Sequence, residues 1–300
     1  MADTINTIPS TKLPLPTNVA DEIWKKVQQE AVLPRLAGAM PQKFGKTDVM
    51  VLTGTPKAQI VGESDAKGAS SVDITTKTVV PVKLHTGVRV SDEFIWGDDD
   101  YRLGVFDLIK DELAKSLVDA LDAIGIHKMN PATGATTNKI DTAICDSTNT
   151  VEYDRADDAD VAIDKAITAV RSKGYEARAI AADVMFDDAM ANVRTKNKER
   201  MYPNGINGYR GLNTATGFVK GESDINAIVG DFSAFKWGVQ KDVPLQVIQF
   251  GDPDNTGRDL AGHNEVFIRA EVVYGIGVMD TDAFALIVDA TEEDKTPSQS

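Results

Sequence analysis

The chain has 300 residues, enough to bury a substantial core, and its length predicts one large or two modest domains. Lysine and arginine total 32 against 46 aspartates and glutamates, so the net charge of −14 argues against a surface that grips phosphate. Cys145 is the only cysteine, which excludes an intramolecular disulfide and a thiolate metal cluster. The sequence shows neither a signal-peptide pattern nor an apolar run of about 18 residues, so we expect synthesis in a reducing cytosol and no membrane span.

The N-terminal segment predicts an extended arm followed by a helix. Pro9, Pro14 and Pro16 favour extended backbone and remove hydrogen-bond donors, so we expect this segment to lie on another surface. Asn18 is a suitable N-cap for a helix that ends at Pro34.

An unusually long alternation follows. From Val72 to Val90, apolar residues or threonine occupy every even position, and the charged residues lie at odd positions. This period of two predicts a single strand far longer than the usual length of about 5–6 residues. Its predicted partner is Asp48–Gly62, interrupted by Gly54 and Pro56, so we expect a two-stranded ribbon with a small, polar tip. Because such a ribbon is only marginally stable by itself in water, the pattern indicates a docking surface on a neighbouring subunit.

The clearest helix comes next. Apolar residues recur at spacings of three and four, whereas Asp107, Asp111 and Asp119 face away from them. We expect the helix to end at Gly125 or at Asn130–Pro131. The predicted core-facing residues are Phe106, Ile109, Leu113, Leu117, Leu121 and Ile124.

A second helix is predicted between the acidic run that follows Tyr153 and Gly174, with Ile163, Ile167 and Val170 facing inward. These three apolar residues recur at spacings of four and three, which is the pattern of one buried helical face.

The remaining segments predict short strands and helices in blocks. Residues 177–196 predict a strand that leads into a helix, and residues 226–250 predict two strands around a turn. Residues 208–219 are rich in glycine and predict a turn. The alternation resumes over residues 266–278 and predicts another strand. This order indicates an α+β fold rather than repeated β–α–β units.

Two short motifs resemble catalytic or nucleotide-binding signatures but are incomplete. Phe44–Asp48 ends like a phosphate-binding loop, yet Met40 occupies the position of its first glycine. Ser64 and Lys67 have the spacing found in penicillin-recognising enzymes, but they fall in the predicted ribbon tip rather than on a helix. An ordinary turn is the better interpretation of both.

Two carboxylate clusters also have simpler interpretations. Asp252–Gly257 resembles the opening of a calcium loop, but the fifth position is Thr256 and the twelfth is His263 instead of a bidentate glutamate. We therefore interpret it as a polar turn. Asp98–Asp100 precede the long helix, where acidic groups favour the positive end of the helix dipole.

The histidines and the cysteine form no recognisable catalytic or metal-binding set. His85, His127 and His263 are scattered over a predicted strand, a helix end and a loop, without metal-ligand spacing. Nothing in the sequence places a histidine beside Cys145. We therefore predict no catalytic, cofactor-binding or metal-ligating residue, no cofactor and no enzymatic activity.

The succession of segments resembles a known family. An arm and a long ribbon lead to "VVPVKLHTGVRVSDEFI", then to the helix "DLIKDELAKSLVDALDAIGI" and the loop "HKMNPATG". Later come "GDFSAFKWGV" and "NEVFIRAEVVYGIGVMDTDAFALIV". This order resembles the major capsid proteins of tailed double-stranded DNA bacteriophages, which have the Hong Kong 97 fold. The resemblance covers roughly residues 48–288 and depends on the order of the elements rather than on a diagnostic motif.

The resemblance implies a division of the chain into five parts. These are an N-terminal arm, an extended β-hairpin loop, a peripheral domain with a long spine helix, an axial domain, and C-terminal strands with a tail. In that order, the expected boundaries are 1–46, 47–92, 93–131, 132–262 and 263–300.

The resemblance also implies a function. Subunits would form pentamers and hexamers that close into an icosahedral shell around the phage DNA, with the extended loop lying across a neighbour. The implied partners are other copies of the chain, a portal, and scaffolding or decoration proteins, with no membrane. The DNA would lie inside without sequence-specific binding. The acidic composition is consistent with this, because an acidic wall does not bind phosphate tightly. The chain lacks the long charged N-terminal scaffold of some relatives, so a separate scaffolding protein or none is implied. Assembly is expected in the bacterial host cytoplasm, and the product is the virion capsid.

Alternatives stay open at this level. An encapsulin-type bacterial compartment has a related fold and encloses cargo enzymes instead of DNA. A metal-dependent enzyme could use Asp98–Asp100 or Asp252–Asp254. Some relatives cross-link a loop lysine to an asparagine of a neighbour, and Lys57, Lys67 and Asn264 are the residues to consider for that chemistry.

Overall fold

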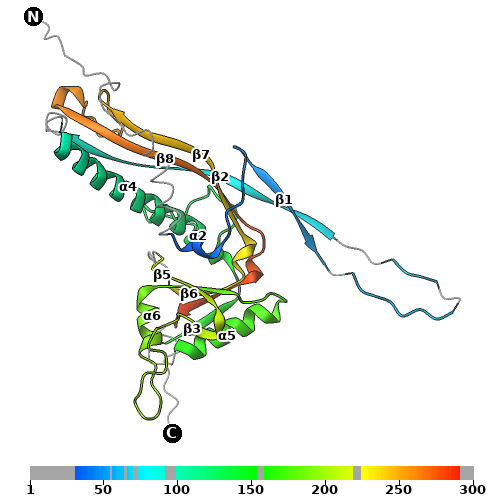
Figure 1. Cartoon of the computed structure of the whole chain (residues 1–300). Coiled ribbons are helices and arrows are strands. Elements are labelled where there is room, and N and C mark those ends of the chain that lie inside the picture. Colours follow the sequence, from blue (N-terminus) through cyan, green and yellow to red (C-terminus); the bar gives the residue numbers. More distant parts are fainter. Residues whose placement is uncertain are drawn as a thin grey trace, which may run out of the picture.

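The architecture consists of two β-sheets joined by helices, with a ribbon that extends away from both (Figure 1). Residues 1–30, which include most of the expected arm and the helix predicted after Asn18, lie outside the described residues. The computed structural model describes residues 31–54, 56–63, 66–69, 73–91, 99–154, 159–218 and 224–290.

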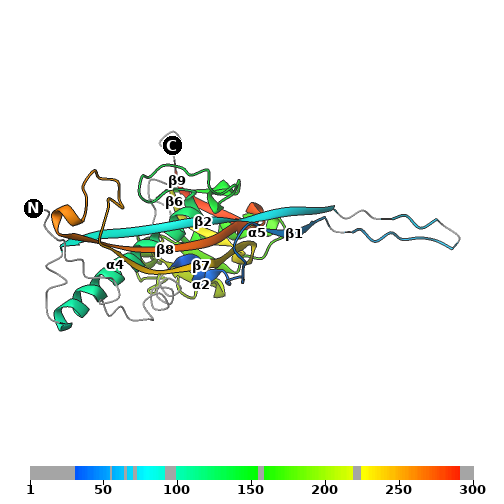
Figure 2. The ribbon, with the colours of Figure 1, turned by 90° about the horizontal axis from the view of Figure 1, so that it is seen from above.

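The first sheet has four antiparallel strands in the order β1-β2-β8-β7. Its strands are β1 (Thr47–Thr53), β2 (Asp73–Ser91), β7 (Phe235–Ile248) and β8 (Glu265–Val278). The predicted nineteen-residue strand is confirmed by β2, and the strand predicted over residues 266–278 is confirmed by β8. Figure 2 shows β2 running out of the body of the molecule into the ribbon.

The strand pairing of β2 differs from the prediction. The segment upstream pairs with β2 only through β1, opposite Asp73–Val79, whereas Val80–Ser91 pair with β8. The prediction of a ribbon formed along the whole upstream segment was therefore wrong. Gly54 has φ of +109°, a left-handed conformation that ends β1. Beyond it, residues 56–63 and 66–69 form no strand.

The long helix α4 (Asp99–His127) lies along one face of the first sheet (Figure 1). The prediction of its buried face is confirmed at Leu113, Leu117, Leu121 and Ile124, which are at most 3 % exposed. These side chains share one core with alternate residues of the strands, among them Val82, Leu84, Val272 and Tyr274. The even positions of β2 and β8 therefore face the helix, as their period of two requires.

The second sheet has five strands in the order β3-β9-β6-β4-β5. The β3–β9 and β4–β5 pairs are parallel, and the other two are antiparallel. The prediction of a turn over residues 208–219 was wrong in part, because β5 pairs there with the buried strand β4 and backbone pairing outweighs the local glycine content. The strands are β3 (Thr150–Tyr153), β4 (Ala179–Ala182), β5 (Asn213–Thr216), β6 (Ile225–Gly230) and β9 (Phe284–Asp289).

Both faces of the second sheet are covered. One face packs against α5 (Ala159–Ser172) and α6 (Val184–Ala191), and the other joins the core beneath α4. This explains why all six residues of β6 are buried and why its sequence shows no polar alternation. Its one polar residue, Asn226, donates to Asp289 Oδ1 at 2.7 Å. The predicted second helix is confirmed by α5, and the predicted strand and helix over residues 177–196 are confirmed by β4 and α6.

Two short crossings connect the sheets. Residues 226–250 form two strands around a turn, as predicted, but β6 belongs to the second sheet and β7 to the first. The same exchange occurs between β8 and β9. The rings of Phe232 and Phe284, one from each crossing, pack edge to face with centroids 5.4 Å apart. The mixed architecture confirms the predicted α+β class. Strand β7 falls within residues 132–262, the expected axial domain, although it pairs with β8 of the expected C-terminal strands.

A short helix, α2 (Val32–Leu36), fills the junction between α4 and the second sheet. The prediction that Pro34 ends a helix was wrong, because Pro34 lies in the first turn of α2, where its missing N–H needs no partner. The buried carboxylate of Asp122 on α4 accepts hydrogen bonds from the first two N–H groups of this turn, Val32 at 3.0 Å and Leu33 at 3.3 Å. The first-turn donors of α2 are thus satisfied by another helix.

The end of α4 also differs from the prediction. Gly125 lies inside the helix rather than at its end, because its missing Cβ leaves room for Leu33 and for Phe235 at the start of β7. The helix ends instead at His127, and Lys128 adopts φ of +54° in the position where glycine is usual. No helix among the described residues is both long and apolar enough to cross a membrane.

The buried face of α4 leads to a first prediction. Leu117→Asp places an unpaired charge in the shared core and should lower the free energy of unfolding by at least about 4 kcal/mol. Lys115→Asp, on the exposed face two residues away, is the matched control and should change it by no more than about 0.5 kcal/mol. Urea denaturation followed by circular dichroism measures both, and equal midpoints for the two variants would show that the helix face is assigned wrongly.

Asp122 leads to a second prediction. Burial raises its pKa to about 6, so the folded state binds a proton more readily than the unfolded state, in which an aspartate has a pKa of about 4. The contribution of Asp122 to stability should therefore fall by about 2–3 kcal/mol as the pH rises from about 4 to about 7, at about 1.4 kcal/mol for each pKa unit.

The difference in unfolding free energy between wild type and Asp122→Asn isolates this contribution from the other carboxylates. Chemical denaturation at several pH values should show the wild type losing stability relative to Asp122→Asn across that interval. The exposed Asp111→Asn variant is the control. A difference that stays constant with pH would contradict the assignment.

Candidate assembly interface

The ribbon carries an exposed apolar face. In the β1–β2 register, Leu52 lies opposite Ile74, and Met50 lies opposite Thr76. Directly opposed residues of an antiparallel pair point to the same side, so Met50, Leu52 and Ile74 share one face, which we call the ribbon face. Their side chains are 79 %, 64 % and 64 % exposed. Each exposed fraction is high for a side chain of this size.

The ribbon face continues the face that packs against α4. Ile74 lies at an even position of β2, as do Val82 and Leu84, which the helix covers. The apolar alternation thus extends beyond the end of the subunit's own core. An apolar face of this kind on an extended ribbon indicates contact with another molecule.

A groove of about 470 Å³ lies where β2 passes over the C-terminal half of α4. Its floor contains Val82, Leu84, Leu117, Ala120 and Ile124, and polar residues of the loop after α4 form its rim. The groove and the ribbon face belong to the same continuous strand, β2. A subunit therefore cannot fold its own ribbon back into its own groove, whereas the ribbon of another copy could reach it.

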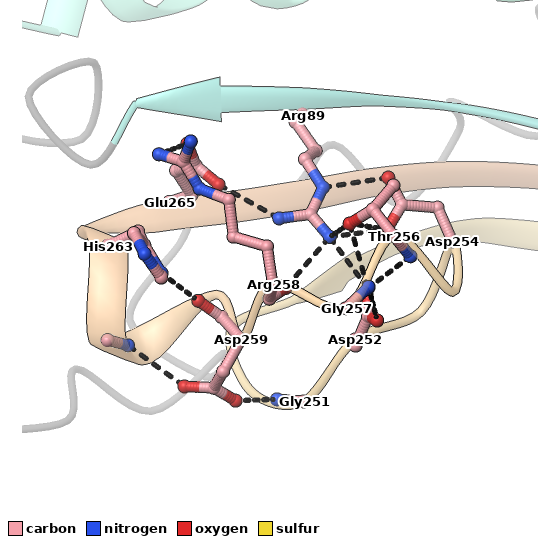
Figure 3. Close-up of polar contacts among 11 residues, drawn as sticks. Arg89, Gly251, Asp252, Asp254, Thr256, Gly257, Arg258, Asp259, His263 and Glu265 are labelled. Atoms are coloured by element: carbon pink, nitrogen blue, oxygen red, sulfur yellow. Dashed lines mark hydrogen bonds and ion pairs between the residues drawn. The ribbon is translucent and has the colours of Figure 1, made fainter.

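At the other end of β2, Arg89 organises the loop between β7 and β8 (Figure 3). Its Nε donates to Asp254 Oδ2 at 2.7 Å and its Nη1 donates to Glu265 Oε2 at 2.9 Å. Its Nη2 donates to Asp252 Oδ1 at 2.8 Å and also to Asp254 Oδ1. All three carboxylates lie in or beside the loop, so the single positive charge of Arg89 is shared among three negative charges, and Arg258 Nη2 also contacts Glu265 Oε1 at 2.6 Å.

The electrostatic consequences follow from these contacts. Hydrogen bonding and charge attraction from Arg89 hold the pKa of Asp254 well below its usual range. The carboxylates of Asp254 and Glu265 raise the pKa of Arg89 in turn. The Arg89 side chain is 18 % exposed and those of its three carboxylate partners are 18–27 % exposed, so the cluster is only partly screened by water.

A second ion-pair cluster lies on the same polar side of the sheet. Glu271, 9 % exposed, forms ion pairs with Lys83, whose Nζ lies at 2.8 Å, and with Arg269, whose Nε lies at 3.1 Å. The hydrogen bond from Lys83 and the charge of Arg269 lower the pKa of Glu271. Arg269 also donates to Gln246 Oε1 at 2.8 Å, which links β7 to β8. The face of the sheet opposite α4 is therefore held by side-chain ion pairs.

A strap formed by residues 37–45 crosses β7 and β8. Trp237 Nε1 donates to the Ala37 carbonyl at 2.9 Å, and the Met40 N–H donates to the Trp237 carbonyl at 2.8 Å. Gly238 and Gly275 are paired across the two strands, and a Cβ at either would collide with the strap, at the Met40 carbonyl or the Gln42 side chain. This part of the expected arm is therefore bound to its own subunit.

The structure does not bring the sequence-selected polar residues together into one catalytic site. His85 is exposed on β2, His127 ends α4, and His263 lies in the turn before β8. Burial raises the pKa of the Cys145 thiol to about 11, so it is a poor nucleophile at neutral pH. No group of three or more histidine, cysteine, aspartate or glutamate side chains suited to a metal occurs among the described residues.

The two acidic motifs of the sequence lie in separate parts of the fold. Asp99 and Asp100 begin α4, as the dipole argument expects, whereas Asp98 and Ser64 lie outside the described residues. Asp252 and Asp254 bind Arg89, which the sequence reasoning missed. Only the β2–β8 register could have indicated these contacts with Arg89, because it pairs Ser91 with Glu265 and so brings this end of β2 to the loop.

Lys57 and Lys67 are exposed in the extended loop, beyond the Asp73 end of β2. Asn264 directly precedes Glu265, which pairs with Ser91 at the opposite end of that strand. The length of β2, roughly 60 Å at about 3.3 Å per residue, separates these lysines from the asparagine of the same chain. A covalent link between them would have to join two copies.

Comparison with known proteins identifies relatives of this architecture. Residues 12–289 match the model of the phage capsid family. No match was found among curated proteins.

Solved structures give the same result. A structure from Mycobacterium phage Ogopogo is 38 % identical, with a TM-score of 0.79 over 87 % of this chain and 92 % of that one. One from Gordonia phage Cozz is 27 % identical, with a TM-score of 0.75 over 88 % and 87 % of the two chains. A structure titled "Capsid of native GTA particle computed with C5 symmetry" shares the fold at 15 % identity and a TM-score of 0.61, covering 86 % of this chain and 90 % of that one.

The family match covers almost the whole described fold, and the family and its structural neighbours point to a structural protein rather than an enzyme. The Hong Kong 97 type of architecture expected from the sequence is confirmed. The chain belongs to the phage capsid family.

Proposed function

We propose that this protein is the shell-forming subunit of an icosahedral phage capsid, in which pentamers and hexamers of identical chains enclose double-stranded DNA. The observation that carries the proposal is the ribbon face, an apolar surface on β1 and β2 that has no core of its own. The groove between β2 and α4 is its proposed partner on a second copy. Because each copy would offer both a ribbon and a groove, the contact is heterologous and can close into rings.

The proposed division of the chain follows the sequence expectation: arm 1–46, extended loop 47–92, peripheral domain 93–131, axial domain 132–262 and C-terminal strands 263–300. The described α4 supports the spine helix of the peripheral domain, and the five-stranded sheet supports an axial unit. The return of β8 and β9 into both sheets supports a C-terminal segment that joins the two units.

The remaining partners are proposed on chemical grounds. With a net charge of −14, the chain offers little for sequence-specific DNA binding, which suits a container whose wall lets DNA move during packaging and release. We further propose assembly in the bacterial cytoplasm with a portal and with scaffolding or decoration proteins. The match to the phage capsid family favours this function over an encapsulin-type compartment.

An enzymatic alternative at Asp252 and Asp254 is disfavoured by geometry. Both carboxylates already bind the Arg89 guanidinium, which leaves them poorly placed to bind a catalytic metal.

Expression of the chain alone tests the function directly. We expect closed shells, or rings of five or six subunits, in negative-stain electron micrographs of the fraction that elutes early from size exclusion. If the chain elutes only as a monomer, we expect co-expression with the products of neighbouring genes to produce shells. A monomer that persists in both experiments would contradict the proposal.

The ribbon face gives a sharper prediction. Leu52→Asp and Ile74→Asp should leave the free energy of unfolding of the isolated subunit within about 0.5 kcal/mol of wild type, because both side chains are exposed. In assembly assays, however, each should reduce the yield of rings or shells at least tenfold, since a charge would be buried without a partner at the contact. Light scattering and electron microscopy measure the yield.

Thr75→Asp is the matched control for these variants. It adds the same charge to the same ribbon, one residue from Ile74, but on the opposite side, where Thr75 pairs with Val51. It should assemble nearly as well as wild type. Equal loss of assembly in all three variants would indicate that net charge, rather than the ribbon face, controls the contact.

A further inference from the structure

A short hairpin, residues 193–201, lies between α6 and β5, and we call it the basic hairpin. The Thr195 N–H donates to the Glu199 carbonyl at 2.9 Å, and the Met201 N–H donates to the Val193 carbonyl at 2.9 Å. These backbone hydrogen bonds pair the two sides of the hairpin, so its conformation is defined by its own main chain.

The basic hairpin carries a positive charge that contrasts with the rest of the chain. Residues 194–200 hold four cations and one glutamate, a net charge of +3, whereas the whole chain has a net charge of −14. All four cationic side chains are exposed, and within the described part of the chain none of them forms an ion pair with a carboxylate. Like charges this close repel one another, so the hairpin is suited to bind a negatively charged partner. The four cations are Arg194, Lys196, Lys198 and Arg200.

Contacts with both neighbouring helices hold the base of the hairpin. Tyr202 Oη donates to Asp160 Oδ2 on α5 at 3.2 Å, and the Ile206 N–H donates to Asp187 Oδ1 on α6 at 2.8 Å. The rings of Tyr202 and Tyr209 pack edge to face, with centroids 5.3 Å apart. The cations therefore project from a base whose position is determined by the fold, which a specific contact between two charged surfaces requires.

One edge of the second sheet carries the opposite charge. β3 is parallel to β9 and β4 is parallel to β5, whereas β9 and β4 are each antiparallel to β6. The carboxyl ends of four parallel strands therefore meet at one edge, beside the start of β6. Carboxylates lie at these strand ends and on the adjoining α6, and we call the set the acidic edge: Asp154, Asp183, Asp188, Asp224 and Asp289.

Both surfaces also contain exposed apolar side chains. Val184 and Met185, at the start of α6, are 54 % and 59 % exposed, and Met201, at the base of the hairpin, is 50 % exposed. A cavity of about 200 Å³ opens at the acidic edge, with Tyr153, Met185 and Asp188 in its lining. Apolar side chains with charges around them are typical of a protein interface, whereas nucleic-acid interfaces are more polar.

The basic hairpin and the acidic edge lie near each other on the subunit. α6 begins next to Asp183 and has eight residues, so at about 1.5 Å per residue the hairpin starts within about 12 Å of the edge. Figure 1 shows the loop after α6 at the end of the second sheet that faces away from the first sheet. Two surfaces at the same end of a subunit can meet between identical copies that are related by rotation about a ring axis.

We propose that the basic hairpin of each subunit binds the acidic edge of the next subunit in the pentamers and hexamers. This contact rests on the proposed function and adds a second heterologous contact to that of the ribbon. Because each copy offers both surfaces, opposite charges meet at every interface of a closed ring. DNA is a less suitable partner for the hairpin, because the carboxylates of the edge lie little more than a Debye length of about 8–10 Å away and repel phosphate.

Charge reversal of the two surfaces in the full-length chain tests this contact. Lys196→Glu/Lys198→Glu reverses the hairpin, and Asp188→Lys/Asp224→Lys reverses the edge. These four side chains are exposed, so the urea midpoint of the isolated subunit should not change. Each double variant should reduce the yield of rings or shells at least tenfold, because like charges would face each other. The chain with all four substitutions should assemble within about twofold of wild type, since opposite charges meet again.

A matched control separates this contact from a change in net charge. Lys165→Glu/Lys241→Glu makes the same change of charge at exposed lysines outside the hairpin, and it should assemble like wild type. If the reversed hairpin folds poorly, Lys196→Gln/Lys198→Gln replaces it and should reduce the yield at least threefold. A gel shift with linear double-stranded DNA is measured for wild type and for the hairpin variant.

Normal assembly of either reversed double variant, or failure of the chain with all four substitutions to regain assembly, would overturn the contact. A hairpin variant that assembles normally but loses the DNA shift of wild type would assign the hairpin to phosphate, and this result would overturn it as well. If wild type forms no rings even when neighbouring genes are co-expressed, the proposed function fails together with this contact. Wild-type rings with unimpaired reversed variants would contradict this contact alone.

Discussion

The pairing of β2 with two different strands is the constraint on which the rest of the structure depends. Val80–Ser91 pair with β8 in the body, and Asp73–Val79 pair with β1 outside it. Because one strand continues through both regions, the ribbon inherits its direction and its twist from the sheet. The apolar side that faces α4 in the body is the side that is exposed to solvent in the ribbon. The need for a second molecule thus follows from a strand that is longer than the core available to cover it.

The strands that cross between the two sheets join them into one body. β8 pairs with β2 over twelve registered positions and then crosses directly into β9, while β6 and β7 make the reverse exchange. Phe232 and Phe284 pack at these crossings, and α2 fills the space beside them with its first turn bound to Asp122. The position of the ribbon relative to the second sheet is therefore determined through packed side chains rather than through a flexible linker. In a closed shell, that rigidity would help to set the angle between neighbouring subunits.

The sequence predicted the elements whose hydrophobic period is long and regular. The period of two in β2 and β8 and the helical spacing in α4 and α5 are strong because each element buries a single face against one core. Prediction failed where the partner of an element is distant in sequence. β5 is a strand because β4 lies beside it, and Val80–Ser91 of β2 pair with β8 rather than with the upstream segment. Pro34 lies inside α2, whose first turn is bound by Asp122 of the distant helix α4. The Arg89 contacts were missed for the same reason: an arginine at an odd position of a strand looks like any solvent-exposed charge until the register places a loop of carboxylates against it.

Two carboxylates with opposite pKa changes show how differently acidic residues act in this acidic protein. Burial without a cation raises the pKa of Asp122, so its contribution to stability declines as the pH rises from about 4 to about 6. Asp254 has a pKa below its usual range because Arg89 binds it, so its contribution is present above about pH 4 and is lost on acidification. Asp122 lies where α2 meets α4, whereas Asp254 lies in the loop at the far end of the first sheet. Acidification from about pH 6 to about pH 4 should therefore strengthen the junction between the sheets, whereas the β7–β8 loop should loosen only below about pH 4. A change in pH thus alters stability locally instead of uniformly.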